Sequence, residues 1–359
     1  MTDVYKQLAE KLDQLPQGYP ATDSGVELKI LRKIFSPEDA EMALKLKYFP
    51  ETADTIGERL AKPVDEIRTT LDTMAEKGQI GSSKMNGNQV YMLAPFVVGI
   101  YEYQLHRLDK ELVDLFEKYL PVLSKTLGGY KPAVARTIPI NMNLKKDYQI
   151  QPYENLAGML ENAKSFRVMD CVCRKEKEIL GEPCEHSLEV CLSFSKEDGA
   201  YDYFSRGGRI ISKDEAFNVI AKAEEEGLIH NVFYNTKDGH GAVCNCCSCC
   251  CGVIRAAKEY GAAHTLAKSN FIAVIDPDEC TACGVCADER CQMGAISEGE
   301  NTYQVENELC IGCGVCTITC PTDAISLIER PKSEQELPPD DFVDWSIKRA
   351  ANRGIKLPE

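Results

Sequence analysis

The sequence contains no run of about 18 apolar residues, the length at which a helix could begin to span a bilayer. Its first residues also lack the apolar core of a signal peptide. They instead place Val4, Leu8, Leu12 and Leu15 on one face of an expected amphipathic helix. These absences predict a protein with no membrane span that stays in the cytoplasm.

Basic side chains are scarce: 41 Lys and Arg stand against 56 Asp and Glu, for a net charge of −15. This balance disfavours nucleic acids and anionic membranes as partners and suits docking on a basic protein surface. The glycine pattern GxGxxG is missing too, and Gly128-Gly129 and Gly207-Gly208 are isolated pairs. No flavin, nucleotide or pterin site is therefore predicted.

Cysteine, in contrast, is abundant, with 18 residues in a chain of 359. A chain expected in the cytoplasm does not keep a disulfide framework, because the thiol pool of that compartment is reducing. Metal binding or redox chemistry is the better explanation. The length and the 44% hydrophobic content predict several α+β domains, each with its own core.

The most regular cysteines form two copies of one motif near the C-terminus. The first is Cys280-Thr-Ala-Cys283-Gly-Val-Cys286 followed by Cys291, and the second is Cys310-Ile-Gly-Cys313-Gly-Val-Cys316 followed by Cys320-Pro321. The following segments CQMGAI and CPTDAI also match, which predicts a duplicated, pseudo-twofold domain. Three thiolates at this spacing, with glycines between them, can wrap three irons of one cube.

Residues 270–330 resemble the bacterial two-cluster ferredoxins, in which the distant fourth cysteine of each motif ligates the other cluster. The resemblance implies two 4Fe–4S clusters, one held by Cys280, Cys283, Cys286 and Cys320 and the other by Cys310, Cys313, Cys316 and Cys291. One departure is that four residues separate Cys286 from Cys291 where the second copy has three, and that Gln292 replaces the proline. A pair of zinc knuckles fits less well, because zinc needs no third and fourth cysteine at this repeated spacing.

Residues 1–97 have a different pattern. Helices are expected from Ser36-Pro37, over 53–61 and from Val64 to Gly78, before a hairpin at Asn86-Gly87. The order resembles a winged helix-turn-helix. Residues 1–100 carry 12 basic and 15 acidic side chains, so we favour a docking or structural role over DNA binding.

The remaining boundaries follow from composition. Residues 98–165 are expected to be a helical linker region, with a long helix over 98–127. Residues 166–269 are expected to be a cysteine-rich α/β domain. In it, helices are predicted from Ser212 to Glu226 and from Gly252 to Tyr260, and LIHNVFY is predicted to be a strand. Residues 331–359 are expected to be a loose C-terminal extension.

Ten cysteines lie in this middle domain: Cys171, Cys173, Cys184, Cys191, Cys244, Cys246, Cys247, Cys249, Cys250 and Cys251. Zinc at the first four is one interpretation, and redox-active vicinal thiols such as Cys246-Cys247 are another. We favour one or two further 4Fe–4S clusters. The simplest division gives one cube to each group of cysteines, but adjacent cysteines point to opposite sides of the backbone, so ligands could cross between the groups. His186, His230 and His240 are expected to be structural.

The order CxCR, GLIHN, CNCCxCCC and a ferredoxin end resembles the 4Fe–4S dicluster proteins of anaerobic bacteria. It implies a metal-binding protein that relays low-potential electrons, through two to four clusters, to or from a partner oxidoreductase. No catalysis by the chain alone is expected. Two alternatives remain open: a redox-sensing transcription regulator that uses the winged region, and an enzyme with an open-site cluster within 166–269.

Overall fold

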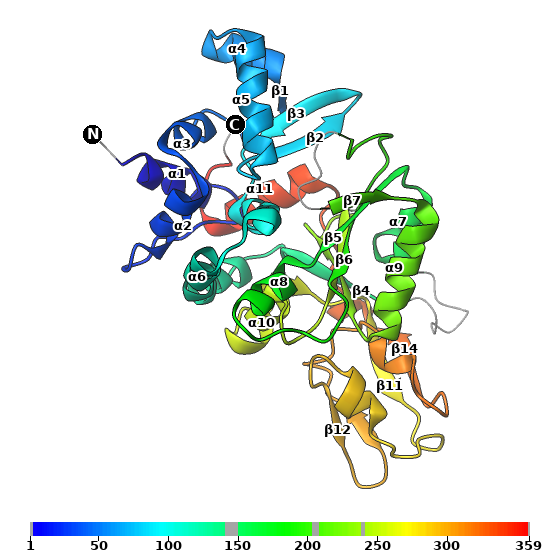
Figure 1. Cartoon of the computed structure of the whole chain (residues 1–359). Coiled ribbons are helices and arrows are strands. Elements are labelled where there is room, and N and C mark those ends of the chain that lie inside the picture. The colour runs from blue at the N-terminus through cyan, green and yellow to red at the C-terminus, as the bar shows by residue number, and fades with distance from the viewer. Residues whose placement is uncertain (1–2, 141–149, 203–207, 238–240, 358–359) are drawn as a thin grey trace.

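The computed structural model describes residues 3–140, 150–202, 208–237 and 241–357. An N-terminal helical region, a central sheet with flanking helices and a small C-terminal β domain follow one another along the molecule (Figure 1). Every helix within the described ranges is too short or too polar to traverse a bilayer.

The N-terminal region combines five helices with a small sheet. The helices are α1 Val4–Asp13, α2 Val26–Ile34, α3 Pro37–Ala43, α4 Ala53–Leu60 and α5 Val64–Glu76, and the strands are β1 Glu51–Thr52, β2 Gly81–Met85 and β3 Asn88–Met92, in the order β1-β3-β2. The Ser36 hydroxyl accepts a hydrogen bond from the Asp39 N–H at 3.1 Å, which caps α3. The helix starts and the hairpin predicted here are confirmed, whereas the winged-helix assignment stays a prediction.

The prediction of one long helix over 98–127 is wrong for the first third of that range. Helix α6 covers only Lys110–Gly128, because Asp109 accepts a hydrogen bond from the Leu112 N–H at 2.9 Å and so begins the helix there. The preceding residues 96–107 form short irregular turns. The Glu102 carboxylate holds one of them by accepting a hydrogen bond from the Gly99 N–H at 2.7 Å.

A seven-stranded sheet forms the centre of the described part, in the order β10-β4-β8-β9-β6-β5-β7. Its strands are β4 Ala135–Ile138, β5 Ser165–Asp170, β6 Glu189–Ser195, β7 Gly208–Ile211, β8 Ile229–Phe233, β9 Ala242–Cys246 and β10 Leu266–Ala267. All pairs are antiparallel except β10 with β4. Residues 98–165 are therefore not helical throughout, because the apolar segment at 133–138 supplies β4 to this sheet.

Helices cover the sheet in two groups. Helices α7 Leu156–Glu161 and α9 Lys213–Glu225 bury Leu160 and Ile220 in one core with Phe166 of β5. Helices α8 Val172–Ile179 and α10 Gly252–Glu259 instead pack with α6 (Figure 1). The helices and the strand predicted within 212–260 are confirmed to within one or two residues at each end.

The C-terminal β domain contains two pairs of strands. Strand β11 Phe271–Ile275 pairs with β14 Ile325–Glu329, and β12 Ile296–Glu298 pairs with β13 Tyr303–Val305, all antiparallel. This domain extends away from the N-terminal helices (Figure 1).

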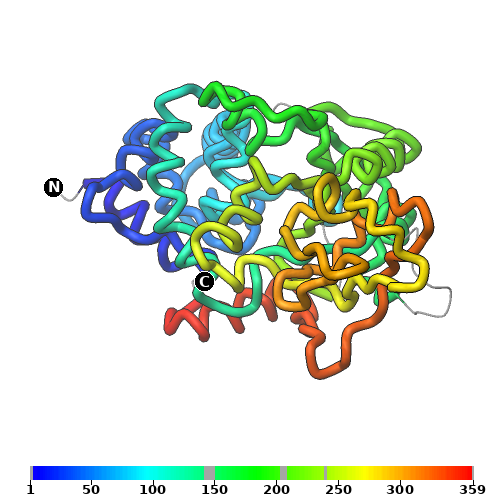
Figure 2. Tube along the Cα trace, turned by 90° about the horizontal axis from the view of Figure 1, so that it is seen from below, coloured from blue at the N-terminus to red at the C-terminus, as the bar shows by residue number. Residues whose placement is uncertain are grey.

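The C-terminal extension is not loose, contrary to expectation. It forms helix α11 Phe342–Arg353, which lies beside the N-terminal helices (Figure 2). Trp345 is fully buried and donates its indole N–H to the Ala133 carbonyl at 2.9 Å. The buried guanidinium of Arg349 donates to carbonyl groups of Pro16, Leu127, Tyr130 and Pro132. Burial of these two side chains, one turn apart, fixes the extension to the core.

Candidate metal centres

The first set of ferredoxin cysteines lies at the outer end of the C-terminal domain. Cys280, Cys283, Cys286 and Cys320 line one cavity of about 20 Å³. Hydrogen bonds from the Thr302 side chain and from the backbone of Tyr303 lower the pKa of Cys280. Cys283 is exposed, so solvent and a partner protein can reach this set.

The second set lies at the inner end, where the domain meets the central sheet. Cys291, Cys310, Cys313 and Cys316 line another cavity of about 20 Å³. Cys310 and Cys316 are buried, and burial raises the pKa of Cys313 to about 12. The Ala295 N–H donates to the Cys291 sulfur at 3.2 Å, as expected beside a ligating thiolate. The structure thus gathers both sets that the resemblance implies, and the four thiols around each cavity are the ligand type and number that a 4Fe–4S cluster requires.

The departure from the ferredoxin pattern has a structural role. Arg290, in the longer segment before Cys291, donates to the Glu224 and Glu225 carbonyls at the C-terminus of α9, both at 2.9 Å. A cation is favourable there because it faces the last carbonyls of the helix. Gln292 stands where the other copy has proline, and it bonds to Ser248 in the six-cysteine segment. The longer, altered segment therefore attaches the ferredoxin part to the central domain.

The ten cysteines of the central domain are divided differently from the simplest expectation. Six of them form a closed ring of thiol–thiol neighbours, in the order Cys171, Cys173, Cys251, Cys246, Cys244, Cys191 and back to Cys171. We call this set the six-thiol ring. All six line a cavity of about 80 Å³. Each group of cysteines in the sequence supplies three members, so the ligands cross between the groups.

The other four cysteines lie close together beside the ring. Cys184, Cys247, Cys249 and Cys250 have sulfur atoms that all lie within 4.8 Å of one another, and we call them the four-thiol site. Cys184 comes from the loop after α8, and the other three come from the turn between β9 and α10. A division by sequence group, with Cys184 beside Cys171, Cys173 and Cys191, is therefore wrong.

Strand pairing explains the crossing. Strands β6 and β9 are neighbours with Leu192 opposite Val243, which brings Cys191 close to Cys244. Cys244 and Cys246 lie two residues apart on β9, so both point to the same side and join the ring, whereas Cys247, the first residue after the strand, joins the other set. In the turn that follows, Cys250 also belongs to the other set, whereas Cys251, which precedes α10, belongs to the ring.

Arg174 is the cation nearest to both sets. Its buried guanidinium contacts the Cys247 sulfur and faces the charges of Cys171 and Cys184. It also donates to the Ser187 carbonyl at 2.5 Å and to the Asn245 carbonyl at 3.0 Å, which fixes its position. A hydrogen bond from Cys250 and the charge of Arg174 lower the pKa of Cys247 to about 5, so this thiol is a ready metal ligand.

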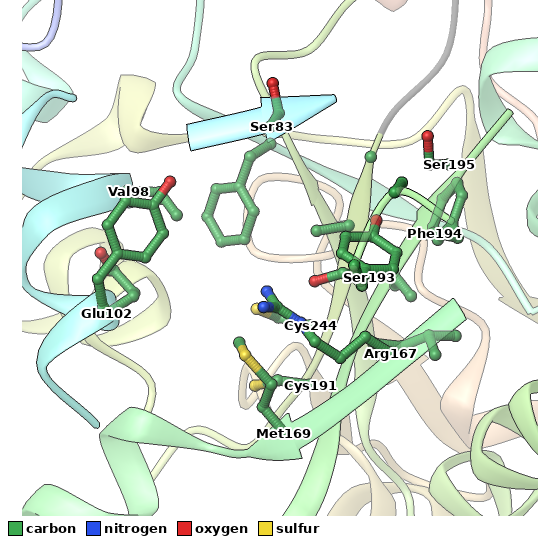
Figure 3. A pocket seen from close by; sticks show the side chains of 18 of the residues that line it. Ser83, Val98, Glu102, Arg167, Met169, Cys191, Ser193, Phe194, Ser195 and Cys244 are labelled. Carbon is green, nitrogen blue, oxygen red and sulfur yellow. The ribbon is translucent and has the colours of Figure 1, made fainter. Parts of the chain in front are cut away.

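A larger cavity of about 400 Å³ opens next to the ring (Figure 3). Cys191 and Cys244 form part of its wall, with Arg167 and Met169 of β5 beside them and Glu102 opposite. The Arg167 guanidinium lies 5.0 Å from the centre of the Tyr201 ring. Burial raises the pKa of Glu102 to about 7. This cavity could not be predicted from the sequence, because its wall comes from segments far apart in the chain.

The histidines do not join any thiol set among the described residues. His230 is buried, with its ring nitrogens 2.6 Å from Asn245 Oδ1 and 3.3 Å from Glu224 Oε1. His186 lies 3.9 Å from Glu226. Both positions agree with a structural role, while His240 lies outside the described residues.

Comparison with known proteins identifies the C-terminal domain. The family "4Fe-4S binding domain" matches residues 303–326. Ferredoxin-2 of Chlorobaculum tepidum is 37% identical over 54 residues, which are 13% of this chain and 86% of that protein. Hydrogenase-4 component A of Escherichia coli is 31% identical over 85 residues, 23% of this chain. Electron transport protein HydN of the same species is 30% identical over 96 residues, 24% of this chain.

The coverage of these relatives is uneven. The matched region spans only 41% of hydrogenase-4 component A and 55% of HydN. No solved structure matches the chain.

Proposed function

Since the chain belongs, through its C-terminal segment, to the family of 4Fe–4S ferredoxins, we propose that it relays low-potential electrons between a partner oxidoreductase and clusters in its central domain. The relatives HydN and ferredoxin-2 support an iron–sulfur electron-transfer role. The proposal of a partner oxidoreductase rests on the similarity to hydrogenase-4 component A, which is named as a part of a hydrogenase. These relatives match only a part of the chain, so the transfer of electrons into the central domain is a further step of our proposal.

One observation carries this extension: the inner ferredoxin set packs against the six-thiol ring. Ile311 and Val315 of the ferredoxin segment share a continuous apolar core with Cys246 and Cys251 of the ring. The Gln292–Ser248 contact joins the same two parts. Electrons would enter at the exposed set with Cys283, pass to the buried inner set and continue to the ring.

We propose that the six-thiol ring holds a further iron–sulfur cluster. Its cavity of about 80 Å³ exceeds the cavity of about 20 Å³ at each ferredoxin set. Helix α10 begins at Gly252, directly after the ring member Cys251, so its N-terminus favours the negative charge of a thiolate-bound cluster. Thiolates of the ring ligate its irons, and the protein tunes the potential through burial and hydrogen bonds.

The N-terminal region serves, in this proposal, to dock a protein rather than DNA. The basic side chains around α5 are already paired: Arg68 with Asp54 at 3.3 Å, Lys62 with Glu66 at 2.9 Å and Lys77 with Asp39 at 3.0 Å. A phosphate backbone would have to displace these carboxylates. A gel shift with genomic fragments at low salt should show no complex, and a salt-sensitive complex would favour the regulator instead.

The experiment that tests electron relay is rapid reduction under anoxia. Protein is mixed with a reduced two-cluster ferredoxin as the donor, and the central cluster is followed by freeze-quench electron paramagnetic resonance. We expect Cys310→Ser, which removes a ligand of the inner cluster, to slow reduction of the central cluster by at least tenfold. An unchanged rate would overturn the route through the ferredoxin domain.

A second candidate function is favoured by the cavity of about 400 Å³ at Cys191 and Cys244. A small molecule in it would lie beside the ring cluster, with the Arg167 cation suited to a negatively charged group. A reduction there would take two electrons, supplied through the clusters by the donor protein, and two protons from water to form two new bonds to hydrogen.

Carbon-13 cyanide is a suitable probe for this second function, because it binds iron that a small molecule can reach. We expect it to perturb the resonance of the reduced ring cluster in the native protein. Met169→Trp, which fills the cavity without removing a thiol, should abolish the effect. A spectrum of the native protein that cyanide leaves unchanged would argue against a substrate site.

A further inference from the structure

The sulfur atoms of the four-thiol site lie closer together than those of either ferredoxin set. Four of its sulfur–sulfur distances are 3.4 Å for Cys247–Cys249, 3.5 Å for Cys249–Cys250, 3.6 Å for Cys184–Cys249 and 3.8 Å for Cys184–Cys247. Among the described residues, this is the one set of Cys, His, Asp and Glu side chains whose ligand atoms all lie within 4.8 Å. Neither ferredoxin set reaches that spacing, although each set surrounds a single cavity.

The spacing can be compared with two kinds of metal site. A tetrahedral ion with sulfur ligands at about 2.3 Å separates those sulfurs by about 3.8 Å, because the edge of a tetrahedron is about 1.6 times its centre-to-corner length. The four thiolates of a cube bind four different irons at its corners, so they stand farther apart. The observed distances of 3.4 to 3.8 Å match the edge for a single ion.

We propose that Cys184, Cys247, Cys249 and Cys250 bind a single Zn²⁺ ion in a closed, structural site. Four thiolates complete the tetrahedral shell and leave no position for water or substrate, as in structural zinc sites. Soft sulfur ligands in this geometry suit zinc rather than magnesium or calcium. Neither the relay nor the ring cluster is needed for this assignment.

The charge balance also fits. Zinc with four thiolates carries a net charge of −2, and such a group needs a nearby cation when it is removed from solvent. The guanidinium of Arg174 contacts Cys247 and faces Cys184 from a fixed position. Among these four sulfurs, only Cys249 is exposed, at the outer side of the turn.

The site would fix the part of the fold on which both neighbouring centres depend. It ties the loop after α8 to the turn between β9 and α10, segments more than 60 residues apart in the chain. The same turn carries Ser248, which contacts Gln292 of the ferredoxin domain, and is flanked by the ring members Cys246 and Cys251. The ion would therefore hold the turn that lies between the relay and the ring.

The test is metal analysis of the full chain after purification without oxygen. We expect about one zinc per chain in the native protein, falling below one fifth of that in Cys249→Ser, with iron and acid-labile sulfide unchanged. The matched control, Cys191→Ser in the ring, should lose iron and sulfide and keep zinc. Native protein without zinc, or equal loss of iron and sulfide in Cys249→Ser, would overturn the proposal.

A second measurement covers the case in which Cys249→Ser does not fold. Zinc-edge X-ray absorption of the native protein should show four sulfur neighbours at about 2.3 Å. A shell with nitrogen or oxygen neighbours would contradict the four-thiol site. Failure of electron relay would leave this spectrum unchanged, so the two proposals fail separately.

Discussion

The side-chain oxygen of Gln292 accepts two hydrogen bonds from Ser248, one from its backbone N–H and one from its hydroxyl, both at 3.0 Å. The amide nitrogen of the same Gln292 side chain donates to the Gly227 carbonyl at 3.2 Å. One amide thus joins the ferredoxin segment, the six-cysteine turn and the end of α9. Pro321, at the matching place in the other copy of the repeat, has no side chain that could make these bonds.

Gln292→Ala should weaken the attachment of the ferredoxin segment to the central domain, because it removes these three hydrogen bonds. Each lost hydrogen bond is worth about 1 kcal/mol, which is enough to weaken the packing of the inner ferredoxin set against the ring without unfolding either part. We expect slower reduction of the ring cluster by the ferredoxin clusters, measured by freeze-quench spectroscopy. Gln304→Ala, at an exposed position of β13, is the control and should behave as the native protein. Equal rates in both variants would mean that the Gln292 hydrogen bonds do not affect electron transfer to the ring cluster.

Cys191→Ser should remove the ring cluster alone. Its thiol contacts Cys171 and Cys244 on either side, so its loss opens the ring at one point. We expect at least four irons and four sulfides fewer per chain, with the signals of both ferredoxin clusters retained. Iron analysis and resonance spectra of the reduced protein measure the change. Loss of the ferredoxin signals as well would indicate that the two modules do not fold separately.

Exposed acidic side chains lie within four residues, along the chain, of cysteines of the outer set, and we call them the acidic rim: Asp276, Asp278, Glu279, Asp288 and Glu289. A basic partner surface would be attracted to this rim, so association should slow as salt rises. The double change Asp278→Lys and Glu279→Lys should slow reduction by a basic donor protein by about tenfold or more at low salt. Stopped-flow absorbance would measure the rate.

The control for the acidic rim changes Glu10 and Asp23 to Lys in the N-terminal region, where both side chains are exposed. It alters the net charge by the same amount, at positions outside the C-terminal domain. If both double variants slow the reaction equally, total charge rather than the rim governs association.

Glu102 predicts a pH dependence of stability. Burial raises its pKa to about 7 in the folded chain from 4.5, so the folded state keeps a proton that the unfolded state has released between these values. Stability is therefore fully present below about pH 4.5 and falls as pH rises towards 7, by about 3 kcal/mol in total. Glu102→Gln should raise the melting temperature at pH 8 and change it much less at pH 5.

Thermal unfolding of Glu102→Gln at the two pH values checks this expectation. Glu300→Gln, a change of the same chemistry at an exposed position, should shift the melting temperature at neither pH. A similar gain for Glu102→Gln at pH 5 and pH 8 would show that the side chain is not titrating as described.

Local signals in the sequence were sufficient for much of the fold. Ser36 and Ser212 cap α3 and α9 through their hydroxyls, as their spacing to Asp39 and Glu215 predicts. The repeated cysteine spacing pointed to the resemblance with two-cluster ferredoxins, and that resemblance implied both ferredoxin sets. These features depend on residues a few positions apart, or on a motif that is itself local.

The division of the ten central cysteines could not be predicted, because it depends on which strands become neighbours. Cys191 meets Cys244 only through the pairing of β6 with β9, across more than 50 residues. Cys184, in the loop after α8, meets Cys247, in the turn after β9, across 63 residues. The available hint was the alternation along the strand, which sends neighbouring cysteines to opposite sides.

Two other features were only partly visible in the sequence: the longer segment before Cys291 and the helix in the C-terminal extension. The longer segment with Arg290 and Gln292 was visible as a departure from the ferredoxin pattern, but its contacts with α9 and Ser248 lie outside that domain. Trp345 and Arg349 stand at helical spacing in the extension. The charged residues scattered around them led to the prediction of a loose extension where the structure has an amphipathic helix.

The dipeptides Cys246-Cys247 and Cys250-Cys251 each give one sulfur to the six-thiol ring and one to the four-thiol site. Only a single peptide bond therefore separates ligands of two different centres. Whichever centre is filled first during maturation immobilises half of the turn that the other needs. The first centre to form should therefore speed the assembly of the second without being required for it, because each centre keeps its own set of thiols.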